Sequence, residues 1–181
     1  MIVLASQSPR RKELMALFGV PFVVRVADIS EDMDKTADPK TQVAQLSRRK
    51  AEAVCRTAED VVIAADTIVV CDGEILGKPK DEADACRMLQ LLSGKGHQVM
   101  TGLTVLKGEK AVVCTQITDV YFRPLTQDQI HSYVRSGEPM DKAGAYGIQG
   151  GAALFVEKLV GDYYNVVGLP VCRLSQILEE M

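Results

Sequence analysis

The hydrophobic positions of the chain form two patterns, short continuous apolar runs and longer segments with helical spacing. Apolar or β-branched runs that end at turn residues predict strands. Such runs occupy residues 2–5, 21–27, 61–66, 97–106 and 111–122. The last two flank the sequence KGEK, which predicts two long strands joined by a turn. Asp72-Gly73 is the strongest tight-hairpin signal in the chain.

Helix start signals recur between these runs. A capping residue, or a proline in the first turn, precedes each amphipathic segment. The signals lie at Ser8-Pro9, Asp38-Pro39, Asp81, Thr126 and Pro170. We expect the first helix to bury Leu14, Leu17 and Phe18 and to end at Gly19. The second helix is expected to run to about Thr57.

Buried strands mixed with hairpins and separated by helices indicate the α/β class with a mixed β-sheet. The chain has 181 residues, enough for one substantial core and few for two independent domains. Hydrophobic residues make up 47% and charged residues 25%, as in an ordinary globular protein. We therefore expect a single domain over residues 1–181.

Charge and hydropathy exclude several classes of partner. The formal net charge of −3 gives no extended basic surface, so we expect no nucleic-acid partner. No apolar run approaches the roughly 20 residues that span a bilayer, so we expect no membrane contact. The apolar N-terminal stretch is too short for a signal peptide and lacks the basic region of one. These features predict a cytoplasmic protein.

The cysteines and histidines form no recognisable reactive group. The five cysteines are scattered, without a Cys-x-x-Cys pair, which argues against structural zinc and against a disulfide framework. We expect them to be reduced and buried. His97 and His131 are isolated, so each is expected to be structural or at the surface.

The junction SQSPRR, residues 6–11, places two serines and two arginines between a strand and a helix. A helix that begins here directs unpaired backbone N–H groups and a partial positive charge at the loop. The hydroxyls of Ser6 and Ser8 and the guanidinium groups of Arg10 and Arg11 would complete a phosphate site. The alternative is an ordinary capped surface helix with two solvated arginines.

Asp66 is the strongest candidate acid. It ends the apolar run 61–66, and ligands of open α/β sheets bind at the carboxyl ends of strands. Thr67 follows it, and Lys78 comes back after the predicted hairpin. An acid, a hydroxyl and a lysine could together hold a metal, a water and a phosphate. The alternative is a strand-terminal aspartate that makes only turn hydrogen bonds.

Two well-known phosphate motifs are excluded. The segment GEILGKP is one residue short of a P-loop, and it has proline where a hydroxyl must bind magnesium. No G-x-G-x-x-G sequence follows a strand. A Walker ATPase and a Rossmann dehydrogenase are therefore not supported.

Three weaker candidates complete the set. Glu31 lies among several acids in DISEDMD, and Lys50 lies in the basic run of SRRKAEAV; taken alone, both are typical of solvated surfaces. The stretch 141–155 is rich in glycine and alanine, which favours close approach of a ligand to the backbone. There Gln149 could pair with a base edge. The alternative is a small-residue turn packed against the sheet.

In combination these segments resemble the Maf-type nucleoside triphosphate pyrophosphatases. The segments that match, in order, are LASQSPRRKELM, ISED, SRRKAEAV, VVIAADTIV, LGKP, AGAYGIQG and GLP. They cover essentially the whole chain, and their agreement in order is more specific than any one motif. The resemblance implies one α/β domain of two lobes around an elongated mixed sheet, similar to the inosine triphosphate pyrophosphatases.

The resemblance also implies the chemistry. The reaction is hydrolysis of a nucleoside triphosphate to the monophosphate and pyrophosphate, assisted by a divalent cation, Mg²⁺ or Mn²⁺. Asp66 would be the catalytic acid residue, as proton acceptor or metal ligand, and Glu31 would support the metal or the water. The residues that would bind phosphate are Ser6, Ser8, Arg10, Arg11, Lys50 and Lys78.

Within the family the chain looks like the branch that prefers dTTP and UTP, because it carries SPRR, ADT and YGIQG. Arg11, Thr67 and Gln149 stand where that branch reads the pyrimidine. The expected role is house-cleaning of pyrimidine nucleotides, including modified ones, by a protein that by analogy could be a homodimer. Two alternatives stay open: a nucleotide-sensing regulatory module that acts through a protein partner in cell-division control, and a purine-directed enzyme on the same fold.

Overall fold

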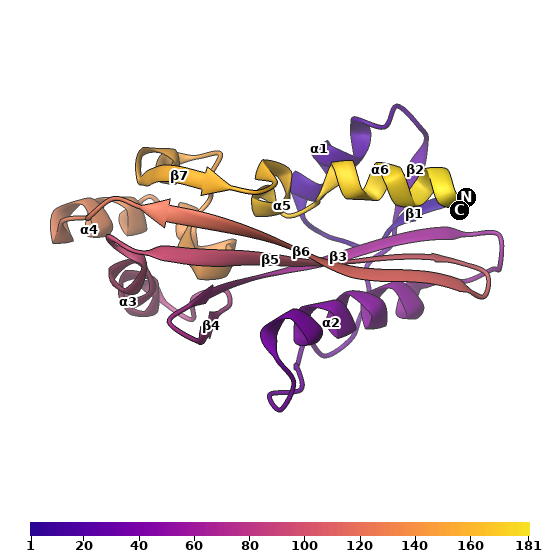
Figure 1. Cartoon of the computed structure of the whole chain (residues 1–181), viewed down its shortest axis with the longest axis horizontal. Helices are drawn as coiled ribbons and strands as arrows, with labels where there is room; N and C mark the ends of the chain where they lie inside the picture. The colour runs from indigo at the N-terminus through magenta and orange to yellow at the C-terminus, as the bar shows by residue number, and fades with distance from the viewer. The chain divides into compact units, whose positions relative to one another are not determined.

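The structure is a computed structural model that describes residues Met1–Met181 (Figure 1). The chain forms two compact units. The first unit comprises Met1–Thr67, Thr101–Gln116 and Tyr164–Met181, and the second comprises Ile68–Met100 and Ile117–Tyr163. Three long strands, β3, β5 and β6, contribute residues to both units.

The strands form a seven-stranded mixed sheet, as the sequence predicts. The strand order is β2 (Phe22–Val24), β1 (Ile2–Leu4), β3 (Val61–Cys71), β5 (Gly96–Lys107), β6 (Lys110–Phe122) and β7 (Val156–Val160), and β4 (Glu74–Leu76) pairs with β3. Strand β1 is parallel to both β2 and β3, whereas the β3–β4 and β6–β7 pairs are antiparallel. Parallel strands connected through helices and antiparallel hairpins therefore occur in one α/β sheet.

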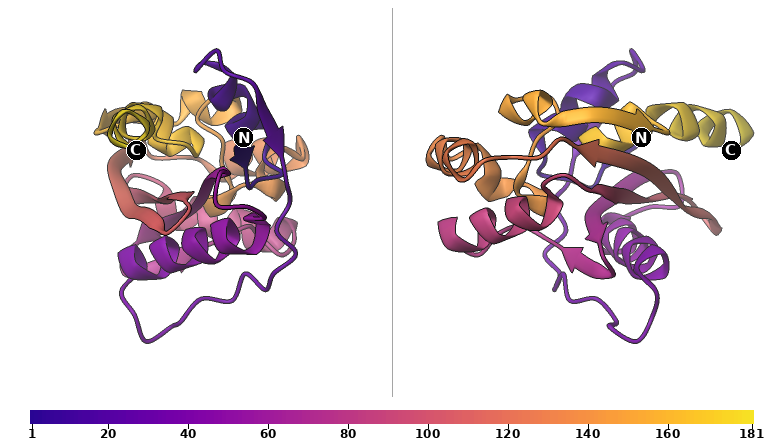
Figure 2. Two further views of the ribbon diagram at one scale, coloured as in Figure 1. Left: turned by 90° about the vertical axis from the view of Figure 1, so that its right-hand side faces the viewer. Right: turned by 60° about the vertical axis from the view of Figure 1, so that its left-hand side comes forward.

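In the first unit, helices cover both faces of the strands (Figures 1 and 2). Helix α2 (Pro39–Val54) lies on one face, and α1 (Pro9–Ala16) and α6 (Val171–Glu180) lie on the other. A buried cluster joins β1, α2 and β3: Val3, Ala5, Ala51, Val54, Val62 and Ala64. This packing fixes the faces of α2 and β3 that carry the candidate site.

Close packing of α2 on the sheet depends on Gly102 in β5. A Cβ atom there would lie 2.3 Å from the carbonyl oxygen of Val43. The backbone of α2 therefore approaches β5 more closely than any other residue type at position 102 would allow.

In the second unit, β4 folds back on β3 through Asp72 and Gly73, both with positive φ angles of 51° and 80°. Helices α3 (Glu82–Leu92) and α4 (Gln127–Arg135) pack on each other, and three short 3₁₀ helices follow α4. The 3₁₀ segments are Glu138–Asp141, Ala143–Ala145 and Gly151–Leu154. Edge-to-face contacts link the aromatic side chains of this unit, with Phe122 between Tyr146 and Phe155.

The predicted helix starts are confirmed. The side chains of Ser8, Asp38, Asp81 and Thr126 cap the helices that follow them. Gly19 has a φ of 65° after α1, and the last helix, α6, follows Pro170. The turn within KGEK joins β5 to β6. None of the helices is long and apolar enough to cross a bilayer.

Several predicted details are wrong. Helix α1 ends at Ala16 rather than at Gly19, and Leu17, its C-cap, is 66% exposed rather than buried. Helix α2 ends at Val54 rather than near Thr57, and the Arg25 guanidinium donates to its terminal carbonyl. The predicted strand over 21–27 shortens to Phe22–Val24, the segment that pairs with β1.

Two further elements and most of the cysteines also differ from expectation. The sequence patterns did not predict β7 or the short helix α5 (Tyr163–Val167). All five cysteines are free, as expected, but Cys71 is the only buried one and Cys172 is exposed.

Candidate functional site

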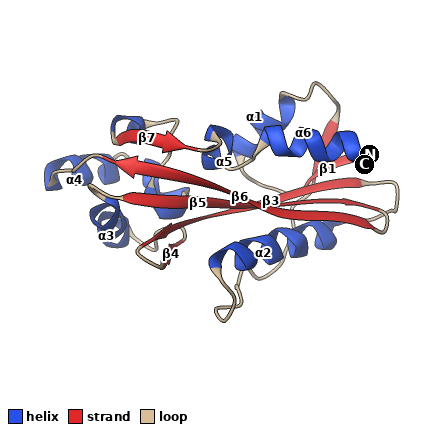
Figure 3. Cartoon of the chain, in the orientation of Figure 1, coloured by secondary structure: helices blue, strands red, loops and turns tan.

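A lysine held between two carboxylates is the centre of the candidate site in the first unit. The Lys50 ammonium group, on α2, lies 2.7 Å from Oδ1 of Asp66 on β3. It also lies 2.8 Å from Oε1 of Glu31, in the long loop between β2 and α2 that Figure 3 shows in tan. The side chains of Lys50 and Asp66 are only 12% and 14% exposed, whereas that of Glu31 is 61% exposed.

This arrangement concentrates negative charge around one cation. Two carboxylates this close would repel each other without the ammonium group between them. Partial burial of Lys50 and Asp66 strengthens their attraction relative to an exposed pair. The Glu31 carboxylate is the solvent-exposed member of the two acids and lies on a loop.

The position of Asp66 corrects one prediction. Strand β3 does not end at Asp66 but continues to Cys71, so Asp66 and Thr67 lie in mid-strand. The apolar face resumes with the buried residues Ile68 and Val69. The strand accommodates both polar side chains because each has a charged partner from a helix, and the alternative of a strand-terminal turn aspartate is wrong.

Arg11 is fixed by three acceptors within the first unit. Its Nε donates to the carbonyl oxygen of Gly168 at 2.7 Å, its Nη2 donates to Oγ1 of Thr67 at 3.0 Å, and its Nη1 lies 3.4 Å from Oγ of Ser6. Burial lowers the pKa of Arg11 below its ordinary value, while the charge of Asp66 acts in the opposite direction. The alternative of two solvated arginines is therefore wrong for Arg11.

Arg11, Thr67 and Thr101 form a series of hydrogen bonds in which each donor and acceptor can be assigned. The Thr101 hydroxyl donates to the carbonyl oxygen of Asn165 at 3.0 Å. Its oxygen lies 2.8 Å from that of Thr67, so the Thr67 hydroxyl donates to Thr101 and accepts from Arg11. Thr67 is thereby fixed next to Asp66. Thr101 is a site-supporting residue that the sequence patterns did not identify.

The serines of the SQSPRR junction take part in local hydrogen bonds and keep a donor each. Oγ of Ser6 accepts from the backbone N–H of Ser8 at 3.1 Å, and Oγ of Ser8 accepts from the backbone N–H of Arg11 at 3.4 Å. Each hydroxyl hydrogen can still be donated. Arg10, half-buried, lies in the first turn of α1. The junction thus combines hydroxyl donors, a helix N-terminus and guanidinium groups.

Lys78 and Gln149 belong to the second unit. Lys78 is exposed in a bend that follows β4, and Gln149 is exposed in a turn over residues 147–150. Tyr146, from the same small-residue stretch, is buried and its hydroxyl lies 2.6 Å from Nε2 of His97. His97 is therefore structural, as expected, and His131 is exposed.

The carboxylates of Glu31 and Asp66 suit a hard divalent cation. Oxygen donors are preferred by Mg²⁺ and Mn²⁺, and Mg²⁺ is often held by one or two carboxylates together with substrate phosphates. No group of three or more His, Cys, Asp or Glu side chains is placed to hold a metal ion. The two-carboxylate set fits a cation whose remaining ligands are phosphate oxygens or waters, with Lys50 next to both carboxylates.

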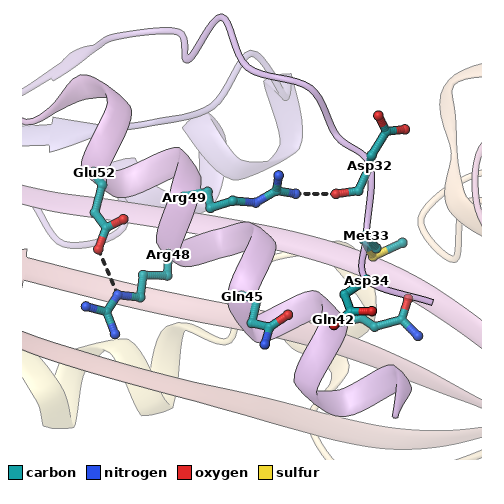
Figure 4. A pocket seen from close by; sticks show the side chains of 8 residues that line it. All are labelled: Asp32, Met33, Asp34, Gln42, Gln45, Arg48, Arg49 and Glu52. Atoms are coloured by element: carbon teal, nitrogen blue, oxygen red, sulfur yellow. Dashed lines mark hydrogen bonds and ion pairs between the residues drawn. The ribbon is translucent and has the colours of Figure 1, made fainter. Parts of the chain in front are cut away.

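The basic run of α2 is not simply solvated. Arg48 pairs with Glu52, Arg49 donates to the backbone carbonyl of Asp32, and Lys50 binds Glu31 and Asp66. Figure 4 shows Arg49 directed at Asp32. Both residues line a pocket of about 340 Å³. Arg49 and Lys50 therefore anchor neighbouring residues of one loop. The run of three basic residues was the only sequence signal for this anchoring of the loop. The run alone did not indicate which residues the three side chains would bind.

The chain is similar to known proteins over its whole length. The family model described as "Maf-like protein" matches residues 1–181. A protein of Symbiobacterium thermophilum named "dTTP/UTP pyrophosphatase" is 51% identical over 99% of this chain and 93% of its own length. A Bacillus pumilus protein of the same name is 49% identical over 98% of this chain and 95% of its own.

Solved structures resemble the chain in fold alone. The Ham1 protein of Staphylococcus aureus has a TM-score of 0.54 at 16% identity, and 99% of this chain and 98% of that chain are covered. A HAM1 protein from Coxiella burnetii has a TM-score of 0.51 at 15% identity, with the same coverage.

Proposed function

Because the chain belongs to the Maf family, we propose that it is a pyrophosphatase that hydrolyses dTTP and UTP to the monophosphate and pyrophosphate. The full-length similarity to two proteins of that name supports the substrates. The observation that carries the chemistry is the placement of the Lys50 ammonium group within 2.8 Å of both the Asp66 and the Glu31 carboxylates.

In the proposed reaction, a water oxygen forms a bond to the α-phosphorus of the nucleotide and the bond to the bridging oxygen breaks, which releases pyrophosphate. Oδ1 of Asp66 is engaged by Lys50, so we assign Oδ2 as the acceptor of the water proton. The hydrogen bond from Lys50 fixes the orientation of the Asp66 carboxylate. Preorganised charge of this kind is a main source of rate acceleration.

Glu31 and Asp66 would hold the divalent cation. A Mg²⁺ or Mn²⁺ ion, when bound, supplies neutralisation of phosphate charge and polarises the P–O bonds. Asp66 then acts as metal ligand, as proton acceptor or as both. The two roles can be distinguished by experiment, because only the role as ligand depends on the metal ion.

The phosphate-binding role is assigned to the SQSPRR junction, with hydroxyl donors from Ser6 and Ser8 and charge from Arg10. Arg11 holds Thr67 and the Gly168 carbonyl, so its contribution includes the rigidity of this region. For Lys78 and Gln149 of the second unit we propose a phosphate contact and a pyrimidine contact, respectively. Modified pyrimidine nucleotides, a house-cleaning role in the cytoplasm and a homodimeric state remain parts of the proposal.

The test is pyrophosphate release from dTTP, UTP, CTP, ATP, GTP and ITP, measured with Mg²⁺ and with Mn²⁺. We expect rapid release from dTTP and UTP and a lower rate from the purine nucleotides. Faster release from ITP would instead support the purine-directed alternative. No release from any nucleotide, with UTP still bound in a calorimetric titration, would support the regulatory module.

A further inference from the structure

The turn that carries Gln149 lies in the second unit and is held by hydrogen bonds to the side chains of Tyr133 and Glu138, a pair that we call the clasp. The backbone N–H of Gly150 donates to the carbonyl oxygen of Gly147 at 3.1 Å, which places Ile148 and Gln149 at the centre of a β-turn. Gln149 is exposed and Ile148 is half-buried. The amide of Gln149 therefore faces solvent, and its position depends on how the two ends of the turn are held.

Both ends of this turn are held by one pair of side chains, Tyr133 and Glu138. The backbone N–H of Gly147 donates to the Tyr133 hydroxyl oxygen at 3.0 Å, and that hydroxyl donates to Oε1 of Glu138 at 2.8 Å. Oε2 of Glu138 accepts from the backbone N–H of Gly151 at 3.2 Å. The three hydrogen bonds close a ring around the turn, and two of them are charge-assisted.

Gly150 makes room for this clasp. A Cβ atom at position 150 would lie 2.1 Å from Oε1 of Glu138. Any other residue at this position would displace the carboxylate, or the turn would have to move. The glycine of the turn and the glutamate that holds it are therefore matched in shape.

Tyr133 is well placed to be the fixed member of the pair. It lies on α4, its side chain is buried, and its ring makes an edge-to-face contact with Phe155 at 5.2 Å between ring centroids. Burial raises the pKa of Tyr133 above its ordinary value, which keeps the hydroxyl protonated and able to donate. Loss of the hydroxyl alone would leave the ring packing in place.

From this geometry we propose that Tyr133 and Glu138 are positioning residues that set the nucleobase preference of the enzyme by fixing the turn of Gln149. The proposal rests on the pyrophosphatase function and on the pyrimidine contact assigned to Gln149. Neither side chain needs to touch the nucleotide, because each acts on backbone groups at one end of the turn. Their effect is on the recognition of the base rather than on the hydrolytic step.

The experiment compares Tyr133→Phe, Glu138→Gln and Gly150→Ala with wild type in two measurements. The first is hydrogen–deuterium exchange of residues 147–151 without nucleotide. The second is kcat and KM for dTTP, UTP and CTP. We expect exchange to accelerate at least tenfold, KM for dTTP and UTP to rise about tenfold, kcat to stay within about threefold, and the preference over CTP to fall.

Glu157→Gln is the matched control. Glu157 is exposed on β7, and its replacement removes the same charge from the same unit as Glu138→Gln does. The thermal midpoint of each variant shows that it is folded. In a Glu138→Ala background, Gly150→Ala should have little further effect, because the carboxylate that the new methyl group would meet is gone. Independent, additive effects of the two changes would contradict the clasp.

The positioning role of Tyr133 and Glu138 and the pyrophosphatase function are contradicted by different results. Unchanged exchange in Tyr133→Phe and Glu138→Gln would show that the clasp does not order the turn. Faster exchange with unchanged KM and unchanged base preference would overturn the role in recognition while leaving the pyrophosphatase intact. No pyrophosphate release by wild type would overturn the proposed function, and the role in base preference with it.

Discussion

At the scale of single residues, the site depends on the Lys50 ammonium group, which separates the carboxylates of Asp66 and Glu31. Lys50 is the cation common to two carboxylates, and it is mostly buried together with Asp66. Exposed surface ion pairs contribute little to stability. A partly buried cation between two acids, in contrast, fixes the orientation of both carboxylates.

Replacement of Lys50 by methionine keeps the length of the side chain and removes its charge. We expect kcat/KM for dTTP to fall about a hundredfold, the cost typical of losing one preorganised electrostatic group. Lys40→Met on the same helix is the control, since that side chain is exposed. Activity of Lys50→Met within threefold of wild type would contradict the assigned role.

His97 gives a prediction on stability that does not involve the site. It is 4% exposed, and burial lowers its pKa from 6.5 to about 4. The folded protein therefore binds fewer protons than the unfolded chain between these values. The contribution of neutral, buried His97 to the free energy of unfolding is complete above about pH 6.5 and is lost as the pH falls towards 4. One pKa unit corresponds to about 1.4 kcal/mol, so the full shift corresponds to about 3.5 kcal/mol.

Urea unfolding at pH 7 and pH 5 measures this effect in wild type, His97→Gln and the control His131→Gln. We expect the free energy of unfolding of wild type and of His131→Gln to fall by roughly 1–2 kcal/mol more between the two pH values than that of His97→Gln. An equal pH dependence in all three proteins would show that His97 is not held neutral by burial.

At the scale of elements, the helix starts could be predicted because they are local. Ser8, Asp38, Asp81 and Thr126 each cap a helix through a backbone group three residues away. Features with distant partners could not be predicted in this way. Strand β7 pairs with β6 some 40 residues earlier, and its sequence VEKLV has no strong apolar pattern of its own.

The contact between α2 and β5 is an element-scale feature with a direct test. Gly102→Ala places a methyl group 2.3 Å from the Val43 carbonyl oxygen, so backbone must move. We expect a loss of about 1–3 kcal/mol, seen as a thermal midpoint lower by several degrees. Gly77→Ala is the control, since its Cβ would meet nothing within 4 Å. An equal midpoint for both variants would contradict the close packing of α2.

At the scale of the whole molecule, the α/β class, the mixed sheet and the family could all be predicted from ordered motifs along the chain. The partners of the site residues could not. Asp66 was placed at a strand end because it follows five apolar residues, whereas its partner Lys50 lies on α2, 16 residues earlier. Arg49 and Glu138 were overlooked because each acts on backbone groups, which leave no trace in side-chain patterns.

The most direct test of the account is the initial rate of pyrophosphate release from dTTP by wild type, Asp66→Asn and Asp128→Asn, with dTTP binding measured in parallel. Asp128 is exposed on α4 and provides the same chemical change outside the site. We expect Asp66→Asn to bind dTTP still but to lose at least a thousandfold in rate, while Asp128→Asn matches wild type. Release by Asp66→Asn within tenfold of wild type would contradict this expectation.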